Sequence, residues 1–510
     1  MPSYRLPGVY IREIPTPRRA ITGVGTTTLG MAGEAERGPL QIRGVTSYAG
    51  YRRLYGDPLA DRYLGHAVRG FFDNGGSRCF VGRVASRLAT IATHDAGSLR
   101  VAAIGPGVAG EKTWIWVTDP VAADPNRFRV VVAYYRDGVV TAAPLDPTIA
   151  ANRSLPGFQT PTELEEFDSL GFTGNDASVA LTALARSSLI RAEWNGPPAR
   201  PGNTGPVALA GGQPGNPPDI DDYIGGSIAV AGMSSPVVTG FAGLAEVDEI
   251  ALLAAPDEHA VAGLRELVQK QCTGAGDRFA IFSVAGGQRD AAAISEPQPP
   301  STMAAVYWPW IRARHPLTNA TVTIPPVGHV AGIFVQTDTT RGVHKAPANV
   351  VVQGAIALEF AVTTEDQDLL NPRGVNVIRD FRSSNRGIRL WGARTMSSDP
   401  EWKYISVRRL AIYLQESIDK GTQWAVFEPN AMPLWESVRA SVEAFLQSVW
   451  RNGALQGARQ EEAFFVRCDR ATMTQADIDS GRLVCEIGIA PVKPAEFVVF
   501  RIRHQAPGRR

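Results

Sequence analysis

One stretch near the end of the chain, residues 387–502, constrains the fold most, because helical and strand-like hydrophobic patterns alternate along it. A helix is predicted from Ser398, since Ser398 and Glu401 have the spacing of a capping box and Pro400 suits a first helical turn. Gly421 ends the helical spacing. The apolar residues of this predicted helix are Trp402, Ile405, Leu410, Tyr413, Leu414 and Ile418.

Further elements follow this helix at short intervals. The apolar run 424–427 predicts a buried strand, and a second amphipathic helix is predicted over 433–453. Two final strands are predicted at 483–489 and 498–502, where apolar side chains alternate along the chain. The stretch therefore predicts a compact α/β module.

Several motifs in this module resemble the C-terminal domain of contractile tail sheath proteins. This family includes the sheaths of contractile phage tails, of pyocin-like particles and of extracellular contractile injection systems. Because matching motifs also occur earlier in the chain, the resemblance covers residues 4–85 and about 245–504. The motifs of the module are 387–395, 398–410, 427–430 (Phe-Glu-Pro-Asn), 465–469 and 496–502, and the earlier ones are 7–11, 74–76, 327–332, 338–343 and 345–349.

The composition is that of a globular protein with several domains. Hydrophobic residues make up 44% and charged residues 20% of the 510 residues, enough for two to four packed cores. The 51 basic residues nearly balance the 50 acidic ones, so no global field favours nucleic acid or an anionic membrane. No apolar run reaches bilayer length and the first residues lack an apolar signal segment, which predicts cytoplasmic synthesis without a signal peptide and no membrane insertion.

The four cysteines, Cys79, Cys272, Cys468 and Cys485, lie far apart in the sequence. Disulfides and a metal site are the functional interpretations, but no short cysteine spacing supports either. We therefore expect buried free thiols in a reducing cell.

The predicted fold class is mixed α/β, with several domains and extended terminal arms. Within the middle domain, residues 247–284 predict a βαβ unit with a right-handed crossover. In the insertion, 163–170 and 177–190 predict short helices. The predicted segments are an N-terminal arm (1–20), the N-terminal part of the sheath core (21–85), a peripheral β-rich insertion (86–240), a middle domain (241–385), the C-terminal sheath domain (386–490) and a C-terminal strand and tail (491–510).

Both ends of the chain carry candidate linking segments. Four prolines among the first 17 residues forbid a helix there, so residues 4–14 are predicted to form a strand. Either this strand lies on the edge of its own domain, or it is donated to a neighbouring subunit, as the resemblance favours. The candidate inter-subunit residues are Tyr4, Pro7, Gly8, Val9, Tyr10 and Ile11 in the N-terminal arm, and Phe497, Val498, Val499, Phe500, Arg501, Ile502 and Arg503 in the C-terminal strand.

Catalytic, cofactor and metal motifs are weak throughout the sequence. The glycine pattern of residues 105–110 matches a dinucleotide loop, but the strand-like residues 113–117 follow it where that fingerprint requires a helix. Asp219, Asp221 and Asp222 lack the spacing of a calcium loop and are interpreted as a solvated loop. His66 is predicted to be half exposed, whereas His329 and His344 are interpreted as hydrogen-bonded loop residues. We therefore predict no catalytic residues, no cofactor and no metal.

The resemblance implies a structural subunit, not an enzyme, in a contractile helical sheath around an inner tube. The expected partners are further copies of the chain in stacked hexameric rings, the inner tube protein, and baseplate and terminal cap proteins. The particle would be a phage tail or a tail-like particle, released by lysis. Two alternatives remain open: a dinucleotide-dependent enzyme that uses residues 105–110, and a non-contractile structural shell protein.

Overall fold

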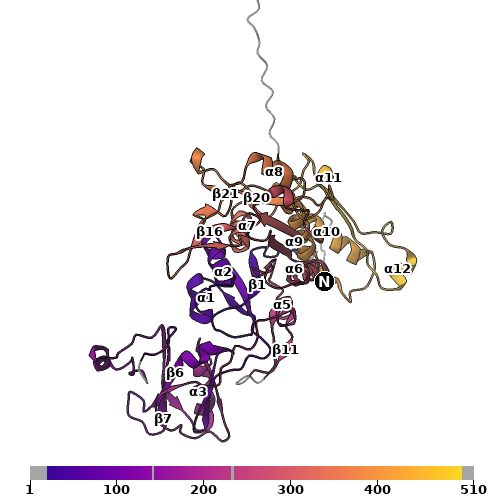
Figure 1. The fold of residues 1–510 in the computed structure, drawn as a ribbon. Helices are drawn as coiled ribbons and strands as arrows, with labels where there is room; N and C mark the ends of the chain where they lie inside the picture. The colour runs from indigo at the N-terminus through magenta and orange to yellow at the C-terminus, as the bar shows by residue number, and fades with distance from the viewer. Residues whose placement is uncertain (1–19, 141–142, 231–234, 497–510) are drawn as a thin grey trace, which may run out of the picture. The chain divides into compact units, whose positions relative to one another are not determined.

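A computed structural model describes residues 20–140, 143–230 and 235–496 of the chain (Figure 1). The contacts divide the chain into two compact units. The larger unit is Gly25–Arg409, and the smaller one contains, among the described residues, 20–24 and 410–496. All candidate inter-subunit residues of the two arms lie outside the described residues.

A nine-stranded sheet organises the described part of the larger unit. Its central strands β3, β1, β13, β14, β15 and β20 are all parallel, as expected for strands joined by helical crossovers. Antiparallel strands complete its two edges. In sheet order the strands are β18 (Val350–Val351), β21 (Ile388–Leu390), β20 (Val375–Asp380), β15 (Ala304–Trp308), β14 (Phe279–Ser283), β13 (Leu252–Ala254), β1 (Thr28–Gly33), β3 (Arg78–Arg83) and β2 (Arg43–Val45).

Helices that accompany this sheet confirm part of the predicted pattern. The βαβ unit is present as β13, helix α6 and β14, and all three elements lie within the predicted span 247–284. The helix α7 contains both His329 and the glycines Gly328 and Gly332, which the sequence did not identify as helical. The helices of this part are α1 (Tyr48–Tyr55), α2 (Leu64–Asp73), α5 (Gly240–Ala245), α6 (Leu264–Ala275), α7 (Val327–Arg341) and α8 (Thr364–Leu370), with 3-10 turns at Ala291–Ala293 and Arg382–Ser384.

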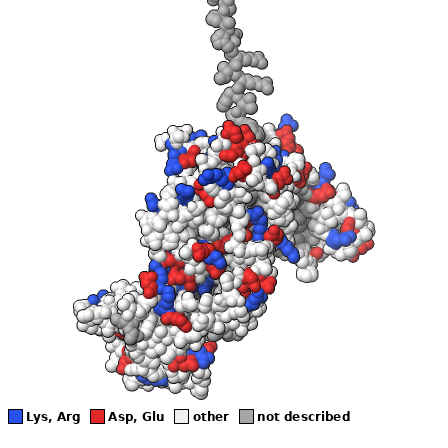
Figure 2. All heavy atoms as spheres, viewed as in Figure 1, with Lys and Arg blue, Asp and Glu red and all other residues white. Residues whose placement is uncertain are grey.

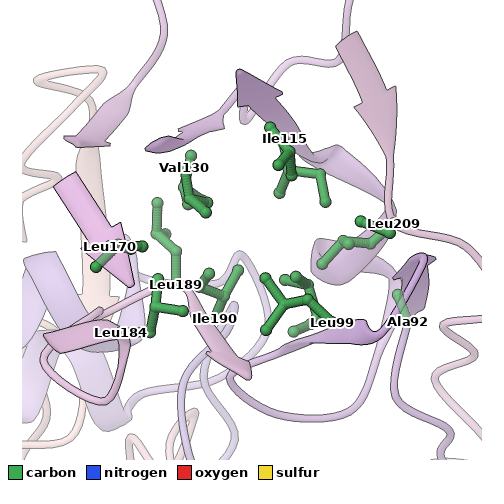
Figure 3. Packing of buried hydrophobic residues seen from close by; sticks show 14 of the residues in the cluster. Ala92, Leu99, Ile115, Val130, Leu170, Leu184, Leu189, Ile190 and Leu209 are labelled. Carbon is green, nitrogen blue, oxygen red and sulfur yellow. The ribbon is translucent and has the colours of Figure 1, made fainter. Parts of the chain in front are cut away.

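The region predicted as a β-rich insertion forms two sheets that enclose their own core. Apolar side chains from both sheets point toward one another between them (Figure 3). The sheets have the orders β10-β6-β7-β8 and β4-β5-β9. Their elements are β4 (Thr93–Ala96), β5 (Leu99–Ala103), β6 (Thr113–Thr118), β7 (Arg127–Tyr134), β8 (Glu163–Gly171), α3 (Gly174–Leu184), β9 (Ile190–Trp194) and β10 (Thr204–Ala208), with 3-10 turns at Val108–Lys112 and Ala150–Ser154.

Residues 163–170 correct one prediction, because they form strand β8 and not a helix. Exposed and partly buried positions alternate along the first part of β8, which is the period of a strand with one covered face. The helix predicted over 177–190 is present only in its first half, as α3, which ends at Leu184, and Ile190 already belongs to strand β9. Short connecting elements complete the larger unit: α4 (Ile220–Ile224), β11 (Ser227–Ile228), β12 (Val237–Val238), β16 (Ile311–Arg314), β17 (Thr321–Ile324) and β19 (Ala357–Leu358).

Residues 398–427 correct two further predictions. The helix predicted from Ser398 begins only at Ile405, since the Asp399 carboxylate accepts the Glu401 N–H in a local turn. The run 424–427 forms no buried strand: Gln423–Ala425 is a 3-10 turn, and Phe427 is fully exposed. The elements of the smaller unit are α9 (Ile405–Thr422, which starts in the larger unit), α10 (Met432–Arg451), α11 (Gln460–Ala463), β22 (Phe464–Arg467), α12 (Gln475–Asp479) and β23 (Glu486–Ile489).

Candidate functional site

The described N-terminal residues belong to the same unit as the C-terminal helices. Ser417 in α9 accepts a 3.1 Å hydrogen bond from the backbone N–H of Val24. Ile21 is buried and packs against Gly421, where a Cβ atom would lie 2.7 Å from the Ile21 side chain. The chain therefore enters the larger unit from a segment held along α9. The last described residue, Glu496, belongs to the smaller unit as well. Both terminal arms therefore begin at the smaller unit.

A two-stranded antiparallel sheet, β22–β23, forms the other half of this site. Ala490 donates its N–H to Ala463, so Gly488 and Glu486, two and four residues earlier, also direct their backbone groups toward β22. The backbone N–H and C=O groups of Ile487 and Ile489 point to the side of β23 that faces away from β22. Within the described residues, no backbone partner occupies that side. The free side of β23 is therefore an open strand edge, and we refer to it by that name.

An apolar groove with a volume of about 350 Å³ runs beside the open strand edge. Helices α9 and α10 supply its other wall, since the amphipathic spacing of both helices brings leucine and isoleucine side chains to one face. An unpaired edge beside an apolar groove is the geometry that accepts an added strand. The groove is lined by Ala411, Leu414, Gln415, Ile418, Asp419, Leu446, Ile487 and Ile489.

The loop between α9 and α10 is tied to the segment that precedes β23. The indole N–H of Trp435 donates to the Asn430 side-chain oxygen at 2.8 Å, and the Asn430 amide donates to the Arg482 carbonyl at 3.1 Å. Trp435 also packs with Cys468 and Met473 in a small buried cluster. These contacts hold the ends of the hairpin, so the open strand edge has a defined position relative to α10.

The glycine loop at residues 105–110 has no geometry for a dinucleotide. Arg83 is buried beneath it and donates to the carbonyls of Gly38 at 2.7 Å and Pro106 at 2.8 Å. The loop continues into a 3-10 turn and then strand β6, so it does not open an α-helix as the dinucleotide fingerprint requires. This absence of a helix agrees with the sequence prediction and removes the feature on which the cofactor alternative rested.

The remaining candidate ligand residues have structural roles. Asp219 and Asp222 form a capping box at α4, and Arg87 pairs with the same acidic cluster. His66, predicted to be half exposed, is buried, and its desolvation lowers the pKa of its imidazole to about 4. His329 is a buried residue of helix α7 and not a loop residue, and burial lowers its pKa to about 3.

Four further observations concern metal ligands, membrane-spanning helices, surface charge and the cysteines. Nowhere in residues 20–140, 143–230 and 235–496 do three or more potential metal ligands gather. None of the helices in these ranges combines the length and the apolar character that a bilayer crossing requires. On the face shown in Figure 2, acidic and basic side chains are interspersed and form no large patch of one sign. All four cysteines are free, as predicted, with Cys485 only partly buried.

Comparison with known protein families decides the identity of the chain. A sequence model of the phage tail sheath protein central domain matches residues 231–396, and one of the phage tail sheath C-terminal domain matches residues 397–505. Together they span more than half of the 510 residues. This chain belongs to the phage tail sheath family. The open strand edge and its groove thus lie within the C-terminal domain of a sheath protein.

Individual sheath proteins resemble it over different lengths. The tail sheath protein of Escherichia phage P2 is 27% identical over 206 residues, which cover 39% of this sheath protein and 49% of the phage protein. The matched region thus spans about half the length of this curated relative. The contracted helical sheath of the anti-feeding prophage is similar over 99% of this chain and 100% of its own, with 25% identity and a TM-score of 0.58. The contracted PVC sheath of an extracellular contractile injection system has the same fold, with 23% identity, 99% of each chain covered and a TM-score of 0.59.

The sequence alone did not identify the open strand edge or the groove of this sheath protein. The alternation over 483–489 predicted a strand there, but it did not show that Ile487 and Ile489 face an unpaired edge. Two signals point to the groove in retrospect. The predicted helix already carried Leu414 and Ile418 one turn apart, and Leu446 lies on the face of the next helix.

Proposed function

We propose that this sheath protein is a subunit of a contractile helical sheath around an inner tube, and that its copies are linked by strands donated between them. The open strand edge carries the proposal, because it offers unpaired backbone groups beside an apolar groove. The occupant is a terminal arm of another copy. Both arms start from the unit that holds the edge, which supports an exchange of arms between like units.

The two arms have the chemistry of such an occupant. Residues 9–11 and 497–502 place apolar side chains at alternate positions, so that one face of an added strand could lie in the groove. At about 3.3 Å per residue, the arm before residue 20 would span roughly 60 Å when extended, enough to reach a neighbouring subunit. A segment of four to six paired residues would contribute several hydrogen bonds of about 0.5–1.5 kcal/mol each.

Linkage through backbone pairs would allow the other contacts between subunits to rearrange. A strand held by main-chain hydrogen bonds keeps its partner while rigid surfaces elsewhere repack between two arrangements. A head-to-tail arrangement of this kind extends into a helix without closing. In this proposal the work of contraction comes from the assembled state, so the subunit performs no catalysis. Its partners are further copies of itself, in stacked rings, and the inner tube, baseplate and cap of the particle.

A lysine on the open strand edge tests the proposal. Ile487→Lys places a charge in the groove without removing a bond to β22, so we expect a folded monomer that forms no sheath. Circular dichroism and thermal unfolding would report the fold, and negative-stain electron microscopy would report the tubes.

A matched control separates strand addition from a general effect of charge. Val121 is 76% exposed in the insertion, and Val121→Lys makes the same chemical change away from the edge. This variant is expected to assemble as the unmodified protein does. Sheaths of normal length from Ile487→Lys would refute strand addition at β23.

A further inference from the structure

Two cysteines face each other across the hairpin that carries the open strand edge. The last register pair of β22 and β23 at this end is Arg467 with Glu486. One step beyond the end of both strands, the same register would place Cys468 opposite Cys485. These cysteines are 17 positions apart in the sequence, which is why their spacing gave no signal. The fold alone brings them together.

The register also determines which kind of cross-strand pair they form. Because Ala463 and Ala490 share a hydrogen bond, the pairs of the same parity, including Arg467 with Glu486, are hydrogen-bonded pairs. If the register continues by one step, Cys468 and Cys485 take the positions of a non-hydrogen-bonded pair, in which Cα atoms typically lie about 4.5 Å apart and side chains are closest. Disulfides span Cα separations of about 4.4–6.8 Å. This register is therefore compatible with a disulfide between the two residues.

The side chains already contact each other. Cys485 packs against the buried cluster that contains Cys468, and the nearby Cys485 thiol lowers the pKa of the Cys468 thiol by stabilising its thiolate. Cys468 is buried against Trp435 and Met473, whereas Cys485 is only partly buried at the margin of that cluster. A small oxidant can therefore approach from the Cys485 side.

We propose that Cys468 and Cys485 are a redox modification site that closes to a cross-strand disulfide when the protein meets hydrogen peroxide. The Cys468 thiolate attacks one peroxide oxygen, the O–O bond breaks, and hydroxide leaves as Cys468 becomes a sulfenic acid. The Cys485 sulfur then attacks the sulfenic sulfur, and its proton leaves with the displaced hydroxide as water. Overall, two thiols lose two electrons and two protons, and one peroxide becomes two waters.

The disulfide would fix β23 in register against β22. Since the opposite side of β23 is the open strand edge, oxidation would hold the acceptor strand in its paired position. This consequence depends on the proposed sheath function, whereas formation of the disulfide does not.

Peptide mapping of the full-length protein tests the proposal. After treatment with hydrogen peroxide and alkylation without reductant, we expect a tryptic peptide containing Cys468 linked to one containing Cys485. Two of the four thiols should be lost. Cys79 and Cys272 are fully buried in other elements and serve as internal controls that remain free and are alkylated after unfolding.

Other outcomes would overturn the proposal. Recovery of both Cys468 and Cys485 in alkylated form after peroxide treatment contradicts it, and so does a disulfide-linked dimer formed through Cys485. In the Cys485→Ser variant the linked peptide must disappear, and Cys468 should be trapped as a sulfenic acid by dimedone. Sheath assembly of the reduced protein, viewed by electron microscopy, tests the proposed function separately.

Discussion

At the scale of single residues, the larger unit depends on a buried ion pair. Asp338 in α7 and Arg409 at the start of α9 pair at 2.7 Å, with only 2% and 4% of their side chains exposed. The Thr26 hydroxyl also donates to Asp338 at 2.7 Å, and the Arg409 guanidinium lies over the ring of Phe334. Both terminal nitrogens of the Arg409 guanidinium donate, to the two Asp338 oxygens and to the Thr26 carbonyl, and such additional hydrogen bonds are the condition for tolerating buried charge.

Removal of one member of this pair should be strongly destabilising. We expect Arg409→Met to lower the free energy of unfolding by about 3–5 kcal/mol, because it leaves the Asp338 carboxylate buried without its cation. The double variant Arg409→Met/Asp338→Leu should recover most of that loss, since no charge remains buried. Urea denaturation of the three proteins measures both effects. Equal stability of Arg409→Met and the unmodified protein would show that the pair contributes nothing.

Two buried histidines predict how stability depends on pH. His66 and His329 have folded pKa values of about 4 and about 3, against 6.5 in an exposed chain, because burial disfavours the imidazolium and nearby Arg69 repels it. The unfolded chain therefore binds protons first as the pH falls below about 6.5. Their contribution to stability is complete above that pH and is lost progressively toward pH 3–4. Buried Asp257, whose pKa is raised to about 6, acts in the opposite direction.

A difference measurement isolates the histidine effect from that of Asp257. We expect His329→Leu to lose less stability than the unmodified protein when the pH is lowered from 7 to 4.5, because it removes one of the groups that must remain neutral. The free energy of unfolding of both proteins, measured across this range, gives the comparison. Parallel pH curves would mean that His329 does not titrate in the unfolded chain as proposed.

At the scale of elements, helices α2 and α7 pack by close approach of their backbones. A Cβ atom at Gly328 would lie 2.1 Å from the Ala67 carbonyl oxygen, and one at Gly332 would lie 2.5 Å from that of Phe71. Glycine therefore allows this contact at a cost in helix propensity. The cost explains why the sequence of α7 was not recognised as a helix, although its burial in the fold stabilises it.

An alanine pair tests this packing directly. Gly328→Ala should destabilise the protein by about 1–3 kcal/mol, because the new methyl group meets backbone and not a flexible side chain. Gly274, in α6, has open space at its Cβ position, so Gly274→Ala should be neutral or stabilising by up to about 1 kcal/mol. Thermal unfolding of the two variants compares the same change in two helices. Similar effects at both positions would contradict the close approach.

The element scale also shows where prediction from sequence succeeded. Long periodic segments, such as the second helix of the C-terminal module and the βαβ unit, were identified correctly because their apolar faces are continuous. The run 424–427 was predicted wrongly, since an apolar segment of four residues has the same sequence pattern whether it is buried or exposed. The Phe427 side chain is exposed, and its backbone has a left-handed conformation with φ of 68°. The helix prediction for residues 163–170 failed for a different reason, because the glutamates in this segment concealed the alternation of a strand.

At the scale of the whole molecule, the sequence predicted half of the candidate site. It indicated the arms as donors, and their residues lie outside the described ranges, so donation remains a prediction. It did not indicate the acceptor, because an open edge depends on which strands pair and on the parity of one hydrogen bond at Ala490. Family membership was predicted from motifs and is confirmed by matches across residues 231–505.

A cryo-electron microscopy map of the assembled sheath tests the central claim most directly. The predicted result is a strand from another copy, hydrogen-bonded to the backbone of Ile487 and Ile489, with its apolar side chains in the groove beside α9 and α10. A map in which that edge is filled by the subunit's own arm, or in which it remains unpaired, would contradict the account.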